Sequence, residues 1–136
     1  METHHILLVE DNPGDVRLIE ESLRMHALDY RIHHYETADK AIRALSGCGN
    51  DGAQIPDLIL LDYNVPRGNA RDILAAASMN PVLADIPKAV VTSSLAPKDR
   101  EQAFELGAHC FIHKPQDLDS FLAEVGSKIV ELLRRG

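Results

Sequence analysis

The chain is poor in the residues that mark several other classes of protein. It contains two cysteines, Cys48 and Cys110, and no tryptophan. So few cysteines do not indicate a disulfide framework, and they suit a reducing compartment. The apolar stretch at 6–9 is too short for a signal peptide or a membrane span. We therefore expect a cytoplasmic domain.

Basic residues are also in the minority. The chain has 14 lysines and arginines against 21 aspartates and glutamates, which gives a formal net charge of −7. This charge opposes non-specific attraction to nucleic-acid phosphates and to anionic lipids. We therefore expect no nucleic-acid partner and no membrane partner.

The length and the overall composition are those of an ordinary globular domain. The 136 residues fit one domain, which we expect to span 1–136. Hydrophobic residues make up 45% of the chain and charged residues 26%, so the chain can bury a core.

Short apolar runs alternate with helical patterns along the chain. The runs at 6–9, 58–61, 89–91 and 110–112 suit buried strands of a parallel sheet, and the more polar stretch at 30–35 suits a strand nearer an edge. This alternation predicts an α/β fold, with a doubly wound five-stranded parallel sheet and helices on both faces. The predicted helices cover 13–26, 37–46, 71–79 and 97–106, and a last one begins near 117.

Polar residues stand where the apolar runs stop. Glu10 and Asp11 follow the first run, and Asp62, Thr92 and Lys114 end three others. In doubly wound sheets the functional residues lie at the carboxyl ends of the strands. Crowded acids need a neutralising charge, either a hard cation such as Mg²⁺ or the lysine. An aspartate in such surroundings can act as a nucleophile towards a phosphoryl group.

Four motifs occur in a characteristic order, namely ILLVEDN, LILLDYNVP, VVTSS and HCFIHKP. With these motifs at these spacings, the chain resembles the receiver domain of two-component response regulators over essentially its whole length. The resemblance implies a flavodoxin-like fold with the strand order 2-1-3-4-5. It also implies a phosphoacceptor signalling protein rather than an enzyme, with at most self-phosphorylation and autodephosphorylation.

The resemblance assigns roles to the acidic residues. Asp62 would accept a phosphoryl group from a phosphohistidine of a sensor histidine kinase in a reaction that depends on Mg²⁺. Asp11, Asp62 and the backbone carbonyl of Asn64 would hold the Mg²⁺ ion, and Glu10 would help through a water molecule.

The resemblance also assigns the residues that respond to phosphorylation. Thr92 and Lys114 would contact the phosphoryl group, and Phe111 would be the switch aromatic that turns inward as Thr92 moves. The Lys114–Pro115 peptide bond would be cis. The face formed by the fourth helix, the fifth strand and the fifth helix would then change its preference for partners.

The first and last segments of the sequence predict which proteins the chain binds. The opening EDNPGDVRLIEESL resembles stand-alone receivers that pair with phytochrome-like sensor kinases. Since no output domain is expected after about Arg135, the signal would pass by phosphorylation-dependent protein binding or dimerisation. Val130 and Leu133, beside the main apolar stripe of the last helix, predict a homodimer through that helix.

The chain departs from the usual receiver pattern in one loop. Ala70 stands eight positions after Asp62, where a glycine is usual, and Gly68 precedes it by two. We therefore expect a different turn here. Asn64 and Ser94 occupy positions that influence phosphoryl lifetime, but because neither is acidic they predict no particular lifetime.

Three other functions are weaker interpretations of the same residues. A degenerate receiver could act as a constitutive interaction module. Such a module would not need the acidic residues, nor Thr92 and Lys114, and all of these are present here. A metal-dependent aspartyl-phosphate phosphatase of the haloacid dehalogenase type would carry an aspartate at position 64, where this chain has Asn64. A flavin-binding protein would need a phosphate-cradling loop after the first strand, where the acidic EDNPGD would repel phosphate.

Overall fold

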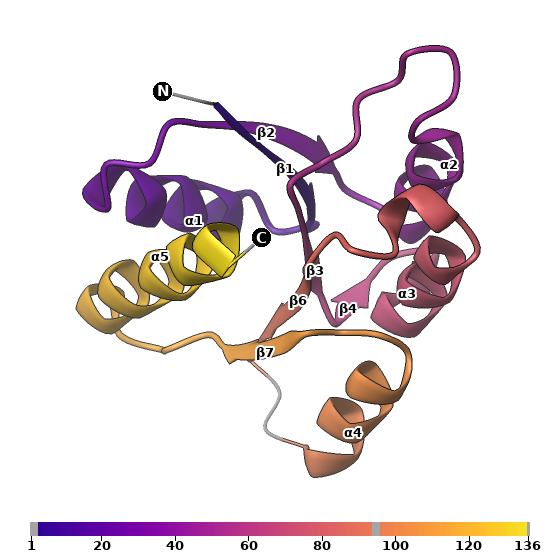
Figure 1. Ribbon diagram of the computed structural model, residues 1–136. Coiled ribbons are helices and arrows are strands. Elements are labelled where there is room, and N and C mark those ends of the chain that lie inside the picture. The colour runs from indigo at the N-terminus through magenta and orange to yellow at the C-terminus, as the bar shows by residue number, and fades with distance from the viewer. Residues whose placement is uncertain (1–2, 94–95, 136) are drawn as a thin grey trace.

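The computed structural model describes residues 3–93 and 96–135, in which a central parallel sheet lies between two layers of helices (Figure 1). The strand order is β2-β1-β3-β6-β7, which is the predicted order under different labels. The labels differ because two short strands form a separate hairpin. The main strands are β1 (His4–Val9), β2 (Tyr30–Tyr35), β3 (Leu58–Asp62), β6 (Lys88–Thr92) and β7 (Cys110–His113).

The helices cover both faces of the sheet, as predicted (Figure 1). One face carries α1 (Pro13–Met25) and α5 (Leu118–Arg135), which lie side by side. The other face carries α2 (Ala38–Gly47), α3 (Ala70–Ser78) and α4 (Pro97–Glu105), and a short 3₁₀ helix, η1 (Pro81–Leu83), follows α3.

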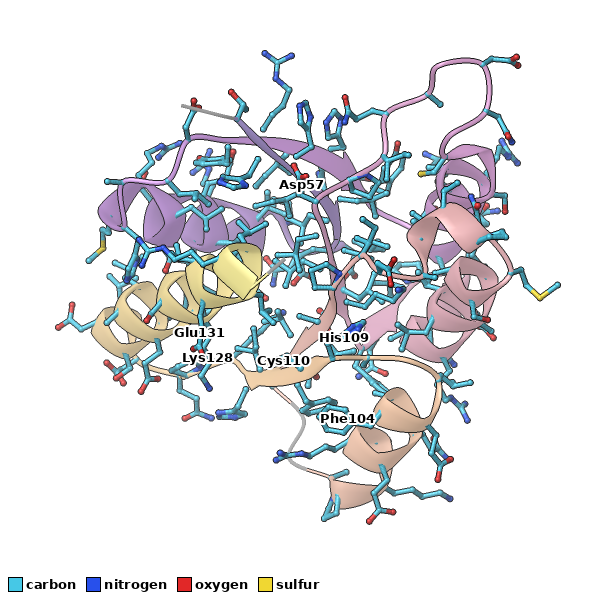
Figure 2. All side chains as sticks on the ribbon, viewed as in Figure 1. Asp57, Phe104, His109, Cys110, Lys128 and Glu131 are labelled. Carbon is cyan, nitrogen blue, oxygen red and sulfur yellow. The ribbon has the colours of Figure 1, made fainter. Side chains whose placement is uncertain are left out.

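Alternation along the strands divides the core into two parts. Ile6 and Leu8 of β1 pack on the side of α1 and α5, whereas Leu7 and Val9 pack on the side of α2, α3 and α4. Successive side chains of a strand point to opposite faces, so a strand covered on both sides is apolar throughout. Figure 2 shows the side chains filling the space between the sheet and both helical layers.

The first helix begins directly beyond β1 because its first turn is capped. The side-chain oxygen of Asn12 accepts hydrogen bonds from the backbone N–H groups of Gly14 and Asp15, at 2.8 and 3.3 Å. Pro13 occupies the first turn, where a missing N–H has no consequence. The cap therefore stabilises the start of α1 directly after the acidic residues that follow β1.

The loop after β3 forms a small hairpin of β4 (Asn64–Val65) and β5 (Gly68–Asn69). Its backbone has positive φ at Arg67 (+61°) and Gly68 (+139°). Ala70 is instead the buried first residue of α3, and its N–H donates to the carbonyl of Tyr63 at 3.1 Å. The positive φ that favours glycine therefore occurs at Gly68. Position 70 begins a helix, so an alanine fits there.

Three details of the sequence interpretation need correction. The described residues contain no cis peptide bond, so Lys114–Pro115 has the trans form that is preferred even before proline. Leu118, expected in the apolar stripe of the last helix, is 55% exposed at the start of α5. Val130 and Leu133, expected at a dimer surface, are each 8% exposed because α5 packs closely on the rest of the chain.

The contact between α1 and α5 depends on a glycine. A Cβ atom at Gly126 would lie 2.5 Å from Ser22 Oγ, 2.6 Å from Ser22 O and 2.7 Å from His26 Nδ1. The Gly126 N–H donates to Ser22 Oγ at 2.7 Å, and this hydroxyl donates to the carbonyl of Leu122. The two helices therefore approach closely enough for a side-chain hydroxyl to join their backbones.

We expect Gly126→Ala to lower the free energy of unfolding by about 1–3 kcal/mol, because the added methyl group forces the two helices apart. Urea unfolding followed by circular dichroism measures the change. Gly47→Ala is the matched control, since nothing lies within 4 Å of a Cβ atom at Gly47 in α2. Equal stability of the Gly126→Ala variant and the wild type would contradict the close contact.

A pair of histidines joins β1 and β2. His5 Nδ1 and His33 Nε2 lie 3.0 Å apart and their rings stack. The backbone N–H of His5 donates to Oδ2 of Asp57, at 2.7 Å, and Asp57, labelled in Figure 2, directly precedes β3. Burial, together with the charges of His5 and Arg31, lowers the pKa of His33 below its usual 6.5. One ring nitrogen must accept the hydrogen bond, so the pair requires at least one neutral ring.

We expect the free energy of unfolding to fall between about pH 7.5 and pH 5.5 more steeply in the wild type than in His33→Gln. The unfolded chain binds a proton at His33 at a higher pH than the folded chain, so acidification through this range favours unfolding. Urea unfolding at several pH values measures the difference. His113→Gln, at an exposed histidine, is the control, and parallel curves for His33→Gln and the wild type would disprove the role of the pair.

Candidate functional site

The predicted site residues gather at the carboxyl ends of four neighbouring strands. Glu10 and Asp11 directly follow β1, Asp62 ends β3, Thr92 ends β6, and Lys114 directly follows β7. The parallel pairing brings these ends to one edge of the sheet. The sequence therefore placed all five residues correctly with respect to the strands.

The ammonium group of Lys114 is the centre of this site. Lys114 Nζ lies 2.6 Å from Glu10 Oε1, 2.8 Å from Asp15 Oδ2 and 3.1 Å from Asp62 Oδ2. The side chain of Lys114 is 9% exposed and that of Glu10 is 2% exposed. Because water screens these pairs only weakly, they interact more strongly than ion pairs on a surface.

Burial and charge act in opposite directions on the ionisable groups. Burial raises the pKa of Glu10 to about 7, although Lys114 opposes this rise and Asp62 adds to it. Burial alone would lower the pKa of Lys114, but the hydrogen bonds to Asp15 and Glu10 and the charge of Asp62 raise it above its usual value. Lys114 therefore keeps its positive charge, whereas the site resists the ionisation of Glu10.

Three acids are placed to hold a metal ion. Glu10, Asp11 and Asp62 each offer a carboxylate oxygen, and these oxygens lie within 4.8 Å of one another. Glu10 is buried, Asp62 half-buried and Asp11 exposed, so the group is open on one side. Oxygen ligands with room for water suit Mg²⁺, which keeps several waters when it binds to proteins. The residues present therefore fit the expected ion.

The fourth predicted metal ligand lies beside Asp62. Asn64 is exposed at the start of the β4–β5 hairpin, and its N–H donates to Asp62 Oδ1 at 3.3 Å. This hydrogen bond ties the hairpin to the carboxylate. The role of the Asn64 carbonyl as a ligand stays a prediction.

The predicted switch residues lie on the two neighbouring strands. Thr92 is buried, and its carbonyl accepts a hydrogen bond from the Lys114 N–H at 2.8 Å. Phe111 is half-buried against the core on the side of α2, α3 and α4. Ser94, which the sequence placed at a position that influences phosphoryl lifetime, lies outside the described residues.

Sequence reasoning missed two residues at this site. Asp15, in the first turn of α1, shares Lys114 with the predicted acids. It lies three positions after the capping residue Asn12, in the acidic segment that follows β1, and this closeness to the predicted acids is the signal that could have identified it. His34 Nε2 lies 2.6 Å from the carbonyl oxygen of Glu10. Its position opposite Leu8 in the β1–β2 pairing could be known only from the register.

Comparison with known proteins identifies the family. The sequence profile of the response regulator receiver domain matches residues 6–126. The chain belongs to this family. Response regulator Rcp1 of Synechocystis sp. is 35% identical to this receiver domain over 114 residues, which are 83% of this chain and 78% of Rcp1.

Two solved structures closely resemble this receiver domain. The phosphorylated cyanobacterial phytochrome response regulator RcpA has a TM-score of 0.88 and 31% identity, over 99% of this chain and 97% of that one. The Mn²⁺-bound form of Rcp1 has a TM-score of 0.85 and 31% identity, over 98% and 96%. Receiver domains also occur within longer proteins, since the chain spans only 23% of a probable cyclic di-GMP phosphodiesterase of Vibrio cholerae, to which it is 31% identical.

We expect Lys114→Met to lower the free energy of unfolding without metal by about 3 kcal/mol, because it leaves buried acids without a compensating charge. Mg²⁺ should restore part of this loss, so that it raises the melting temperature of the variant more than that of the wild type. Thermal unfolding with Mg²⁺ and with a chelator measures both effects. Lys40→Met, at an exposed lysine of α2, is the control, and an equal Mg²⁺ effect in variant and wild type would contradict the compensation.

Proposed function

We propose that Asp62 accepts a phosphoryl group from a phosphohistidine of a sensor histidine kinase, and that the resulting aspartyl phosphate is the signal. The observation that carries this proposal is the position of the Asp62 carboxylate. It lies 3.1 Å from the Lys114 ammonium, and its side chain is 14% exposed, so it is not sealed off from solvent. Membership of the receiver family supports the same role.

In the proposed reaction, a carboxylate oxygen of Asp62 forms a bond to phosphorus as the phosphorus–nitrogen bond of the phosphohistidine breaks. The electron pair of that bond stays with the imidazole, which leaves as the phosphoryl group becomes bonded to Asp62. Lys114 and Thr92 are expected to contact the equatorial phosphoryl oxygens, on which negative charge develops. These two residues therefore stabilise charge, while Asp62 supplies the nucleophile.

The proposed metal ligands are Asp11, Asp62 and the Asn64 carbonyl, with Glu10 acting through a water molecule. Bound Mg²⁺ would supply positive charge to the phosphoryl oxygens. The oxygen atoms of Glu10, Asp11 and Asp62 support this assignment by their spacing. The Mn²⁺-bound form of Rcp1 supports a divalent ion in a related receiver.

The proposed output is a change at the face formed by α4, β7 and α5. Thr92 would move towards the phosphoryl group, and Phe111 would turn further inward. Phe104 of α4, labelled in Figure 2, and Leu118 of α5 are exposed large apolar side chains. Exposed apolar side chains of this kind favour a protein partner for this face.

The proposed kinase partner is phytochrome-like, because RcpA is named as a phytochrome response regulator and resembles this chain over its whole length. We place the protein in the cytoplasm as a single receiver domain over 1–136, and we assign it no independent enzymatic turnover. Its two free cysteines suit a reducing compartment. Among the described residues, no helix has the length and apolar character to cross a membrane.

Dimerisation remains part of the proposal, but with different residues from those first expected. Val130 and Leu133 are buried within the chain, so they are not available as the contact surface. A dimer through the last helix would have to use its exposed side, and the exposed Leu118 makes the start of α5 the better candidate.

Intact-protein mass spectrometry after incubation with acetyl phosphate and Mg²⁺ tests the phosphoryl acceptor. We expect one phosphoryl adduct on the wild type and no adduct on Asp62→Asn or in the presence of a chelator. Asp57→Asn, at a carboxylate that hydrogen-bonds the His5 backbone away from the site, is the control and should still be modified. A wild type without an adduct would favour a constitutive interaction module, and an adduct on Asp62→Asn would mean a different acceptor.

A further inference from the structure

Asp15 is the second-closest partner of the ammonium group in the site. The Lys114 ammonium has three N–H donors, and three carboxylates lie within hydrogen-bonding distance, those of Glu10 (2.6 Å), Asp15 (2.8 Å) and Asp62 (3.1 Å). Asp62, the proposed nucleophile, is the most distant of the three. The two acids from the end of β1 and the start of α1 therefore hold Lys114 more closely than the acceptor does.

The position of Asp15 in its helix suggests a function other than capping. An acid at the third position of a helix often accepts the N–H of the capping residue, as Asp72 does from Asn69 in α3. In α1 the N–H of the capping residue Asn12 is instead directed to Glu10 Oε2, at 3.3 Å. The Asp15 carboxylate is thereby left to approach Lys114.

The surroundings make this contact strong. The side chain of Lys114 is 9% exposed and that of Asp15 is 26% exposed. At such depth the attraction between opposite charges is only partly screened, and a charge-assisted hydrogen bond is stronger than a neutral one. Removal of the Asp15 charge therefore changes how Lys114 divides its attraction between the remaining acids.

We propose that Asp15 is a positioning residue for Lys114, which it holds with Glu10 beside Asp62 so that the acceptor carboxylate stays only loosely paired. This proposal rests on the proposed function of Asp62. A carboxylate that is tightly paired with an ammonium group is a weaker nucleophile, because its negative charge is neutralised. Without Asp15, Lys114 would move towards Asp62 and Glu10, and phosphoryl transfer would slow.

The same arrangement suits the phosphorylated state. Lys114 can exchange its longest contact, the one to Asp62, for an oxygen of the phosphoryl group on that residue, and it can keep Glu10 and Asp15 as anchors. Asp15 would therefore act before and after transfer without touching the phosphoryl group itself.

The rate of phosphorylation by acetyl phosphate at saturating Mg²⁺ tests the proposal. We expect Asp15→Asn to be slower than the wild type by roughly tenfold, the size of effect that follows from removing the negative charge of the acceptor in a charge-assisted hydrogen bond. Asp15→Glu, which keeps the charge, should recover part of the rate. Asp119→Asn, which removes an acid from the first turn of α5, is the matched control and should keep the wild-type rate.

A double-mutant cycle separates positioning from a general effect of charge. If Asp15 acts through Lys114, Asp15→Asn should have little further effect in a Lys114→Met background. If the two effects multiply as independent changes do, the proposal is wrong. Circular dichroism of each variant verifies that it is folded.

A measurement without phosphorylation tests the contact itself. In nitrogen–proton NMR spectra of the metal-free protein, the Lys114 ammonium should give a resonance in the wild type and in Asp15→Glu, because hydrogen bonds slow its exchange with water. It should broaden or shift in Asp15→Asn. An unchanged resonance and an unchanged rate in Asp15→Asn would overturn this proposal alone, whereas a wild type that takes up no phosphoryl group would overturn the proposed function and with it the transfer step.

Discussion

The ion-pair cluster around Lys114 is the interaction on which the rest of the site depends. Carboxylates from the end of β1, the first turn of α1 and the end of β3 approach one ammonium group from the end of β7. The charge of this ammonium group offsets the mutual repulsion of acids placed so close together. The sheet must therefore bring the ends of β1, β3 and β7 to one edge, and the pairing through β6 does so. A divalent cation at the open side of the cluster would serve the same electrostatic need.

The helices around the sheet are not all packed equally firmly. On one face, α1 and α5 are joined through Ser22 and Gly126, and α5 contributes several buried side chains. On the other face, Ala103 is the buried residue of α4, and the neighbouring Phe104 is exposed. An element with so little buried surface can shift at a lower free-energy cost. The structure thus combines a firmly packed base for the acids with a lightly packed helix near Thr92 and Phe111.

The sequence alone determined the fold class and the main members of the site, whereas the strand order was implied only by the family resemblance. Continuous apolar runs identify strands that are covered on both faces, and polar residues at their ends identify the functional edge, because both features come from local order along the chain. For the same reason the order of residues is enough to identify Glu10, Asp11, Asp62, Thr92 and Lys114 as members of the site. The helix boundaries also followed from caps and from apolar spacing, with small shifts at their ends.

Only the tertiary structure decided which side chains meet. Asp15 joins Lys114 because α1 leaves β1 at an angle that the capping residue permits but does not encode, and His34 reaches the Glu10 carbonyl because of the β1–β2 register. Helical periodicity predicted whether Leu118, Val130 and Leu133 lie in or beside the apolar stripe of the last helix. Their exposure, however, depends on how far the neighbouring elements extend over α5. Local patterns fix where a side chain points from its own element, whereas contacts across the sheet depend on the packing of elements distant in sequence.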